Sequence, residues 1–152
     1  MLCVLGIVNK IFKGAFFLFN MKTNILLDTN FIIACVSQKI DFLEGIKRLF
    51  YLYDIIIPKQ VMNELRKISD DDSAKREDRE GAMVALEILK SKRINGIKFP
   101  DLKEENTDKA IIDFAEANKN SVVATLDKEL KEALKDKARM LIIRDKKKIE
   151  IL

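Results

Sequence analysis

The sequence predicts an α/β domain with a mostly parallel central sheet and helices on both of its faces. Short runs of β-branched and aliphatic residues alternate with longer segments of helical periodicity. The chain has 152 residues, of which 48% are hydrophobic, so a single domain can bury a core of its own. Repeated strand–helix units favour parallel pairing, because a helical crossover brings the chain back to the same end of the sheet.

The first 20 residues differ from the rest of the chain. They are apolar and rich in phenylalanine, but two lysines interrupt the run. A signal peptide would begin with a charged region, and a transmembrane helix would not carry lysines at mid-span. Met21 stands directly before the first predicted strand, so we expect the domain to cover residues 21–152, with residues 1–20 as an appended helix or a misassigned start. We expect no membrane partner; the residues that would support the alternative, peripheral membrane contact, are Phe16, Phe17 and Phe19.

In the first half of the domain, local signals mark where helices begin. Asp41 is a residue type that caps helices, and the fixed φ of Pro58 suits the first helical position. The predicted elements are a strand at 24–28, a helix from about Phe31, a helix after Asp41, a strand at 54–57, a helix from Pro58 and a loop at 69–73.

The second half follows the same pattern. Asn95-Gly96 ends a long helical segment, and Asn106 or Thr107 is placed to cap the helix that follows. The predicted elements are a helix at 74–92, a strand at 97–99, a helix after residue 106 or 107, a strand at 121–125, a helix at 128–134 and strands at 139–143 and 149–152.

Composition removes several classes of function from consideration. The chain contains no histidine, which excludes Ser-His-Asp and Cys-His catalysis, histidine general bases and imidazole zinc sites. Its two cysteines are too few for a disulfide framework, so a reducing, cytoplasmic location is the simpler expectation. The net charge of +4 and the pI near 9.0 fit a polyanionic partner, although a lysine-rich surface is often only a solvated one.

Four acidic residues occupy positions that suit a metal-dependent nuclease. Asp28 and Asp127 follow two predicted strands, Glu64 lies in a predicted helix, and Asp108 opens another. Ligands of open α/β sheets gather outside the carboxyl ends of the strands, so these side chains are expected to converge in one cleft. Any one of them alone is more often only a strand end, a solvated helix residue or a helix cap, and it is the set of four that favours a site. The nearby acids whose helix positions favour an exposed face are Asp113, Glu116 and Glu129.

The four acids lie in four short blocks: Leu27-Asp28-Thr29-Asn30-Phe31, Asn63-Glu64-Leu65, Thr107-Asp108-Lys109-Ala110-Ile111 with Ala115, and Ala124-Thr125-Leu126-Asp127-Lys128-Glu129-Leu130. In order and spacing these blocks resemble those of the PIN-domain ribonuclease family, and the resemblance spans about Met21 to Leu152. Residues 142–148 are similar to the end of archaeal members related to the ribosome-processing branch. That branch often has a second aspartate after its third acidic residue, where this chain has Lys109.

The resemblance implies an endoribonuclease that uses Mg²⁺ or Mn²⁺, as one or two ions. Carboxylates forced together repel one another and are costly to desolvate, and a hard divalent cation with oxygen ligands removes both penalties. Asp28 and Asp127 are expected to ligate the metal most directly, while Glu64 and Asp108 complete the acidic cleft, partly through waters. An amide or hydroxyl beside a ligand can fix its rotamer. The candidates for that supporting role are Thr29, Asn30 and Thr125.

Cationic residues are candidates for holding an RNA backbone, because a groove that follows phosphates needs positive charge and little base readout. Lysines that flank helices more often serve only to keep a protein soluble. The candidate RNA-binding residues are Lys128, Arg144, Lys146, Lys147 and Lys148.

The cellular role is a separate question from the chemistry. One hypothesis is processing of ribosomal RNA precursors with a ribosome-precursor partner, and a second is the toxin of a toxin–antitoxin pair. A third is a non-catalytic RNA-binding or assembly module, although a surface that binds a polyanion gains nothing from four carboxylates at its centre. The resemblance also implies a homodimer, with the predicted apolar helix at 31–36 as the candidate surface.

Overall fold

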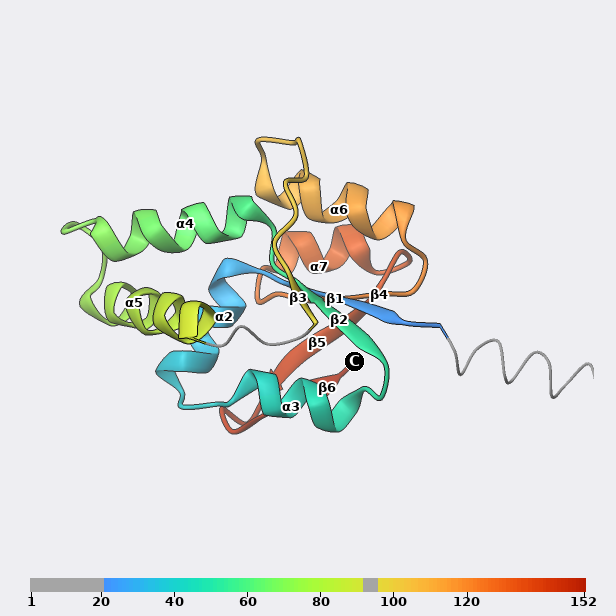
Figure 1. Ribbon diagram of the computed structural model, residues 1–152, viewed down its shortest axis with the longest axis horizontal. Helices are drawn as coiled ribbons and strands as arrows, with labels where there is room; N and C mark the ends of the chain where they lie inside the picture. Colours follow the sequence, from blue (N-terminus) through green and yellow to red (C-terminus); the bar gives the residue numbers. More distant parts are fainter. Residues whose placement is uncertain (1–20, 92–95) are drawn as a thin grey trace, which may run out of the picture.

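Six strands form one mixed sheet at the centre of the protein (Figure 1). The structure is a computed structural model that describes residues 21–91 and 96–152, so our expectations for residues 1–20 and 92–95 lie outside the described residues. All neighbouring strands are parallel except the last pair, β5 and β6. In their order across the sheet, the strands are β3 (Ile97–Lys98), β2 (Tyr53–Ile56), β1 (Thr23–Leu27), β4 (Ser121–Ala124), β5 (Arg139–Arg144) and β6 (Lys148–Ile151).

Helices cover both faces of the sheet, which confirms the predicted α/β architecture (Figure 1). Successive side chains of a strand point to opposite faces, so Ile25 and Leu27 of β1 join one core cluster and Leu26 joins the other. The helices on the first face are α2 (Thr29–Ser37), α3 (Phe42–Leu49), α4 (Lys59–Asp70) and α5 (Arg76–Ser91). Those on the second face are α6 (Thr107–Ala117) and α7 (Lys128–Leu134).

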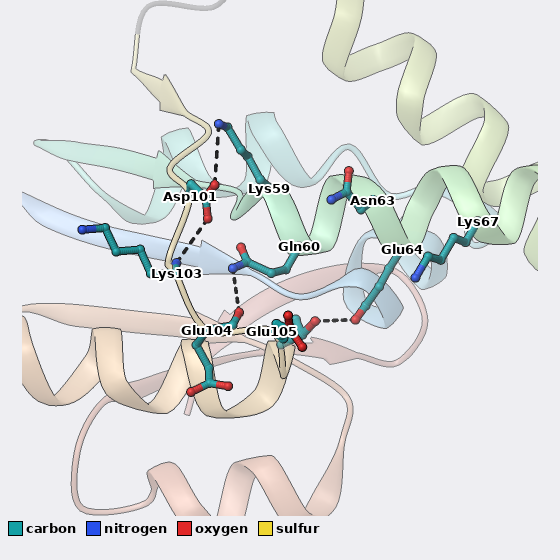
Figure 2. A pocket seen from close by; sticks show the side chains of 10 residues that line it. Lys59, Gln60, Asn63, Glu64, Lys67, Asp101, Lys103, Glu104 and Glu105 are labelled. Carbon is teal, nitrogen blue, oxygen red and sulfur yellow. Dashed lines mark hydrogen bonds and ion pairs between the residues drawn. The ribbon is translucent and has the colours of Figure 1, made fainter.

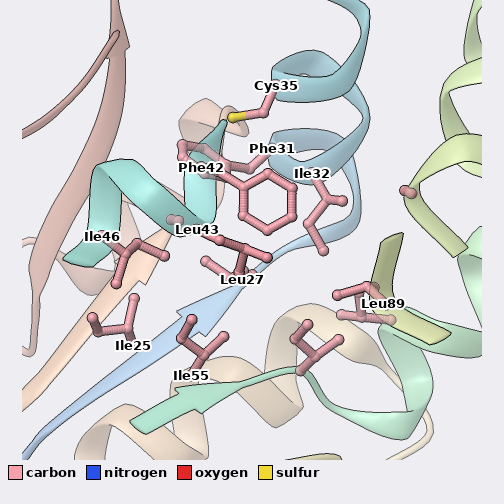
Figure 3. Packing of buried hydrophobic residues seen from close by; sticks show 14 of the residues in the cluster. Ile25, Leu27, Phe31, Ile32, Cys35, Phe42, Leu43, Ile46, Ile55 and Leu89 are labelled. Carbon is pink, nitrogen blue, oxygen red and sulfur yellow. The ribbon is translucent and has the colours of Figure 1, made fainter. Parts of the chain in front are cut away.

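The apolar side chains of α2 belong to the core of the domain. Phe31, Ile32 and Cys35 are fully buried and pack against strand residues that include Ile25 and Leu27 (Figure 3). Burial raises the pKa of the Cys35 thiol to about 12. Much of the apolar face of the helix predicted at residues 31–36 is therefore covered by its own domain, and a dimer surface there stays a prediction.

Several element boundaries differ from the prediction. Pro58 is the residue before α4 rather than its first helical residue, because its ψ of 147° is extended. The helix then continues through Ser69 to Asp70, where we expected a loop; the Ser69 hydroxyl donates to the backbone carbonyl of Arg66, so it bonds within the helix. The following helix begins at Arg76 instead of residue 74.

Side-chain caps fix the helix starts that matter for the site. Asn106 Oδ1 accepts a 2.9 Å hydrogen bond from the backbone N–H of Lys109, which makes Asn106 the cap of α6. Asp28 and Asp127 cap α2 and α7. No helix within the described ranges is long and apolar enough to cross a membrane.

Candidate active site

Asp28 lies where β1 ends and α2 begins, and its carboxylate is held on both oxygens. The backbone N–H of Thr29 donates to Oδ1 at 2.8 Å, and the Thr125 hydroxyl donates to Oδ2 at 2.7 Å. The parallel pairing of β1 with β4 places Leu27 beside Ala124, so the residues after the two strands meet. Asp28 is 5% exposed and Thr125 is fully buried, so the carboxylate orientation is fixed inside the protein.

Asp127 lies at the same edge of the sheet, three residues after β4. Its Oδ1 accepts a 2.8 Å hydrogen bond from the backbone N–H of Leu130, and its own N–H donates to the Thr125 hydroxyl at 3.1 Å. Thr125 therefore donates to one acid and accepts from the backbone of the other. Its supporting role beside metal ligands stays a prediction.

Glu64 approaches from α4, and two hydroxyls hold its carboxylate. Thr29 Oγ1 donates to Oε2 and Thr107 Oγ1 donates to Oε1. Figure 2 shows Glu64 reaching from its helix toward the start of α6, with Lys67 on the same helix. The carboxylate is partly buried, so these hydrogen bonds replace water that it would otherwise bind.

Asp108 is in the first turn of α6, and its pKa shows which charges are near it. Partial burial raises the pKa of the Asp108 carboxyl, and the negative charges of Asp127, Glu64 and Glu129 raise it further. Burial likewise raises the pKa of Asp28 in spite of its two hydrogen bonds, and Asp108 and Glu64 add to that rise. The four acids, which come from separate segments of the chain, therefore share one electrostatic environment.

The donor set of this environment fits a hard divalent cation. Its carboxylates and hydroxyls offer only oxygen ligands. A bound cation would offset both the desolvation cost and the charge repulsion that raise the pKa values of Asp28 and Asp108. Within residues 21–91 and 96–152, however, no group of three acidic or cysteine side chains stands ready to hold a metal ion. Each oxygen of Glu64 accepts one hydrogen bond from a hydroxyl, so ligation would use the remaining lone pairs of these oxygens and would require the acids to move closer together.

Two depressions flank the acids. One, of about 370 Å³, lies beside Glu64 and is lined on α4 by Lys59, Gln60, Asn63 and Lys67, and opposite them by Asp101, Lys103, Glu104, Glu105 and Thr107 (Figure 2). The other lies beside Asp127. Its remaining lining residues are Asn30, Leu126, Lys128 and Glu129.

Two basic residues of the β5–β6 hairpin form ion pairs within the hairpin. Arg144 Nε lies 3.1 Å from Glu150 Oε2, and Lys148 Nζ lies 2.8 Å from Glu150 Oε1. Lys146 and Lys147 are exposed in the turn between the two strands. A role in RNA binding for this turn stays a prediction.

Sequence reasoning did not assign two of the residues that the structure brings to this site. Thr107 was expected only as an alternative helix cap, yet its hydroxyl contacts Glu64. Glu129 was expected on a solvated face; it is exposed, but its charge acts on Asp108. The adjacency of Thr107 to Asp108, which mirrors that of Thr29 to Asp28, was the available signal for the first.

The fold and the grouped acids define a nuclease-like α/β domain, and comparison with known proteins identifies the family. The family described as PIN like domain matches residues 25–147, so this chain belongs to the PIN-domain family, as its sequence blocks predicted. Among curated relatives, ribonuclease VapC4 of Methanocaldococcus jannaschii is 33% identical over 129 residues, covering 84% of this chain and 95% of the relative. The rRNA-processing protein fcf1 of Schizosaccharomyces pombe is 32% identical over 128 residues, covering 81% and 61%.

Solved structures agree with this assignment. The PIN domain endonuclease Utp24 superposes with a TM-score of 0.64 at 26% identity, covering 84% of this chain and 90% of that one. VapBC2 from Rickettsia felis, solved with a DNA fragment from its promoter, gives a TM-score of 0.52 at 17% identity, covering 78% and 97%. The second likeness is one of fold alone.

Proposed function

We propose that this protein is an endoribonuclease that hydrolyses RNA phosphodiester bonds with Mg²⁺ or Mn²⁺ held among Asp28, Glu64, Asp108 and Asp127. The observation that carries the proposal is the shared electrostatic environment of these four acids at the carboxyl end of the sheet. Membership of the PIN-domain family and the 33% identical ribonuclease relative support the reaction and the substrate class.

The role of each acid would depend on how firmly hydrogen bonds fix its carboxylate. Asp28 is fixed by two donors and Asp127 by one, so both present a defined oxygen at the end of the sheet. Among the residues that the structure describes, the Asp108 side chain has no hydrogen-bond partner, so it can turn toward an incoming group. A bound divalent cation would supply a water of lowered pKa and neutralise charge on the phosphoryl oxygens.

Substrate contacts would come from cations around the acids. Lys128 lies in the depression beside Asp127, and Lys59 and Lys67 line the depression beside Glu64. Phosphate contacts of this kind hold a strand in place without reading its bases. We also propose the hairpin residues as more distant contacts, which would require Arg144 and Lys148 to leave Glu150.

The test is cleavage of a labelled structured RNA by the full chain in Mg²⁺, Mn²⁺ or EDTA. Asp108→Asn should abolish the cation-dependent cutting, whereas Asp113→Asn, an exposed acid on the same helix, should cut like the unmodified protein. Isothermal titration with Mn²⁺ gives an independent readout. Equal cutting by both variants, or cutting that persists in EDTA, would contradict the proposal.

The relatives support two cellular roles. The name of the Schizosaccharomyces pombe relative favours ribosomal RNA processing. The Methanocaldococcus jannaschii relative is named a ribonuclease, and the second role that we propose for such an activity here is that of a toxin with an antitoxin partner. Growth arrest on expression, relieved by a neighbouring gene product, supports the toxin. Unprocessed ribosomal RNA precursors on depletion support the processing enzyme.

Size-exclusion chromatography with light scattering decides whether the protein is a homodimer.

A further inference from the structure

Thr107 and Thr29 occupy equivalent places in two different helices. Each is the first residue of its helix, α6 for Thr107 and α2 for Thr29. Each donates a hydrogen bond from its hydroxyl to a different oxygen of Glu64. The two threonines thus hold one carboxylate of a third helix from both sides. They are 43 and 35 positions away from Glu64 in the sequence, so the arrangement depends on the packing of three helices.

Helix capping does not explain these hydroxyls. The orphan N–H groups at a helix start are usually satisfied by the residue before the helix. Here Asp28 accepts from the backbone of Thr29, and Asn106 accepts from the backbone of Lys109, so other side chains provide the caps. The hydroxyls of Thr29 and Thr107 do not cap their helices and donate instead to Glu64.

Each threonine also adjoins one of the other acids. Thr29 follows Asp28 and Thr107 precedes Asp108, so both hydroxyls tie the position of Glu64 to the neighbouring acids. A continuous set of hydrogen bonds runs from Thr125 through Asp28 and Thr29 to Glu64 and on to Thr107.

The chemical type of the donors is important. A lysine or arginine in this place would hold Glu64 equally well but would cancel its charge and repel a cation. Hydroxyls are neutral donors, so they orient the carboxylate while its full negative charge remains. The remaining lone pairs of its two oxygens stay available for a further partner.

We infer that Thr107 is a positioning residue that, with Thr29, orients the Glu64 carboxylate toward the divalent cation of the proposed nuclease. The inference rests on the proposed function. Outer groups that orient a metal ligand typically change metal affinity by about 10–100-fold when removed. Loss of the Thr107 hydroxyl should therefore lower the affinity for the cation without weakening the RNA contacts made by lysines.

The test compares Thr107→Val, which keeps the shape and removes the donor, with Thr107→Ser, which keeps the donor. Mn²⁺ affinity of the full chain is measured by isothermal titration or by electron paramagnetic resonance, and far-ultraviolet circular dichroism confirms folding. Thr107→Val should lower the Mn²⁺ affinity by about 10-fold or more, and Thr107→Ser should lower it by less than about 3-fold. In RNA cleavage the valine variant should lose kcat with little change in KM at a fixed, subsaturating Mn²⁺ concentration.

Thr107→Ala provides the same measurement if the valine variant does not fold, because alanine suits a partly exposed helix position. Unchanged Mn²⁺ affinity in a folded valine or alanine variant, with tight binding by the unmodified protein, overturns the positioning role alone. No Mn²⁺ binding by the unmodified protein overturns the proposed function and this inference with it.

Discussion

The hydroxyl of Thr125 donates a 2.7 Å hydrogen bond to Oδ2 of Asp28, a residue 97 positions earlier in the chain. The same hydroxyl accepts from the backbone N–H of Asp127. One fully buried oxygen therefore fixes the relative placement of the two acids that follow the central strands.

Thr125→Val is expected to lower the free energy of unfolding by about 1–3 kcal/mol, because it leaves a buried carboxylate oxygen without a donor. The Thr125 bond also opposes the effect of burial on the pKa of Asp28, so that pKa should rise further in the variant. Urea unfolding at pH 7 measures the loss. Thr125→Ser keeps the donor and should recover most of the stability; equal losses in the two variants would assign the effect to packing instead.

Asp108→Asn is expected to raise the melting temperature at pH 7 in EDTA, by on the order of 1–3 °C. The folded-state pKa of Asp108 is raised, so the unfolded chain releases the proton first and the free energy of unfolding falls as pH rises above about 3.8. The asparagine variant lacks this penalty. At pH 3, where the carboxyl is protonated in both states, the gain should disappear. Asp113→Asn serves as the control; a melting temperature unchanged by Asp108→Asn at pH 7 would argue against the raised pKa.

Asp54 joins two lysines at the opposite end of the sheet from the acids. Lys22 Nζ and Lys98 Nζ each lie 2.7 Å from one of its carboxylate oxygens. Burial alone would raise the pKa of Asp54, but the bonds and charges of the two lysines outweigh it and hold the pKa below its ordinary value.

Asp54→Asn is accordingly expected to cost about 1–3 kcal/mol at neutral pH. A lowered folded-state pKa stabilises the protein above the ordinary value of 3.8, and this contribution is lost as pH falls through the folded pKa. Chemical unfolding of the two proteins from pH 7 down to pH 2 should show the difference shrink. A difference that is constant with pH would contradict the ionic origin.

Gly45 of α3 lies directly against Ile149 of β6. A Cβ at Gly45 would stand 2.7 Å from Ile149 Cγ1 and 2.8 Å from its Cδ1. Alanine normally stabilises a helix interior by up to about 1 kcal/mol relative to glycine. The overlap should cost about 1–3 kcal/mol, so we expect Gly45→Ala to be destabilising overall.

A double-mutant cycle with Ile149→Ala tests that origin. Ile149→Ala alone destabilises through lost burial, but Gly45→Ala added to it should be neutral or stabilising, because the clashing atoms are gone. Strictly additive effects in thermal unfolding would show that the contact is not the cause.

The order and type of the elements followed from the sequence because most strands are short aliphatic runs and helices have one apolar face. The ends of the elements were harder to predict where a side chain forms a hydrogen bond to the nearby backbone. Ser69 looked like a loop residue, yet its hydroxyl bonds to Arg66 within α4, and the backbone of Pro58 is extended rather than helical. The antiparallel direction of β6 relative to β5 follows from the short connection, because the residues 145–147 between them are too few for the crossover that parallel strands need.

That the four acids would lie near one another could be predicted, but the hydroxyls and charges around them could be predicted only in part. Asp28 and Asp127 follow strands whose carboxyl ends meet by the general geometry of parallel sheets. The contact of Thr107 with Glu64 depends on how α4 and α6 approach each other, and no spacing in the sequence encodes that distance. The pairing of Arg144 with Glu150 likewise arises only when the hairpin closes.

The position of β1 between β2 and β4 has a consequence for synthesis. A chain emerging from the ribosome can pair β1 with β2 early, but β4 is translated only after nearly all of the helices. Until then Asp28 has neither the Thr125 hydroxyl nor Asp127 beside it. A polypeptide that we propose cuts RNA would thus be unable to assemble its acidic site, and to cut the RNA that encodes and makes it, until Thr125 and Asp127 have been translated and folded against Asp28.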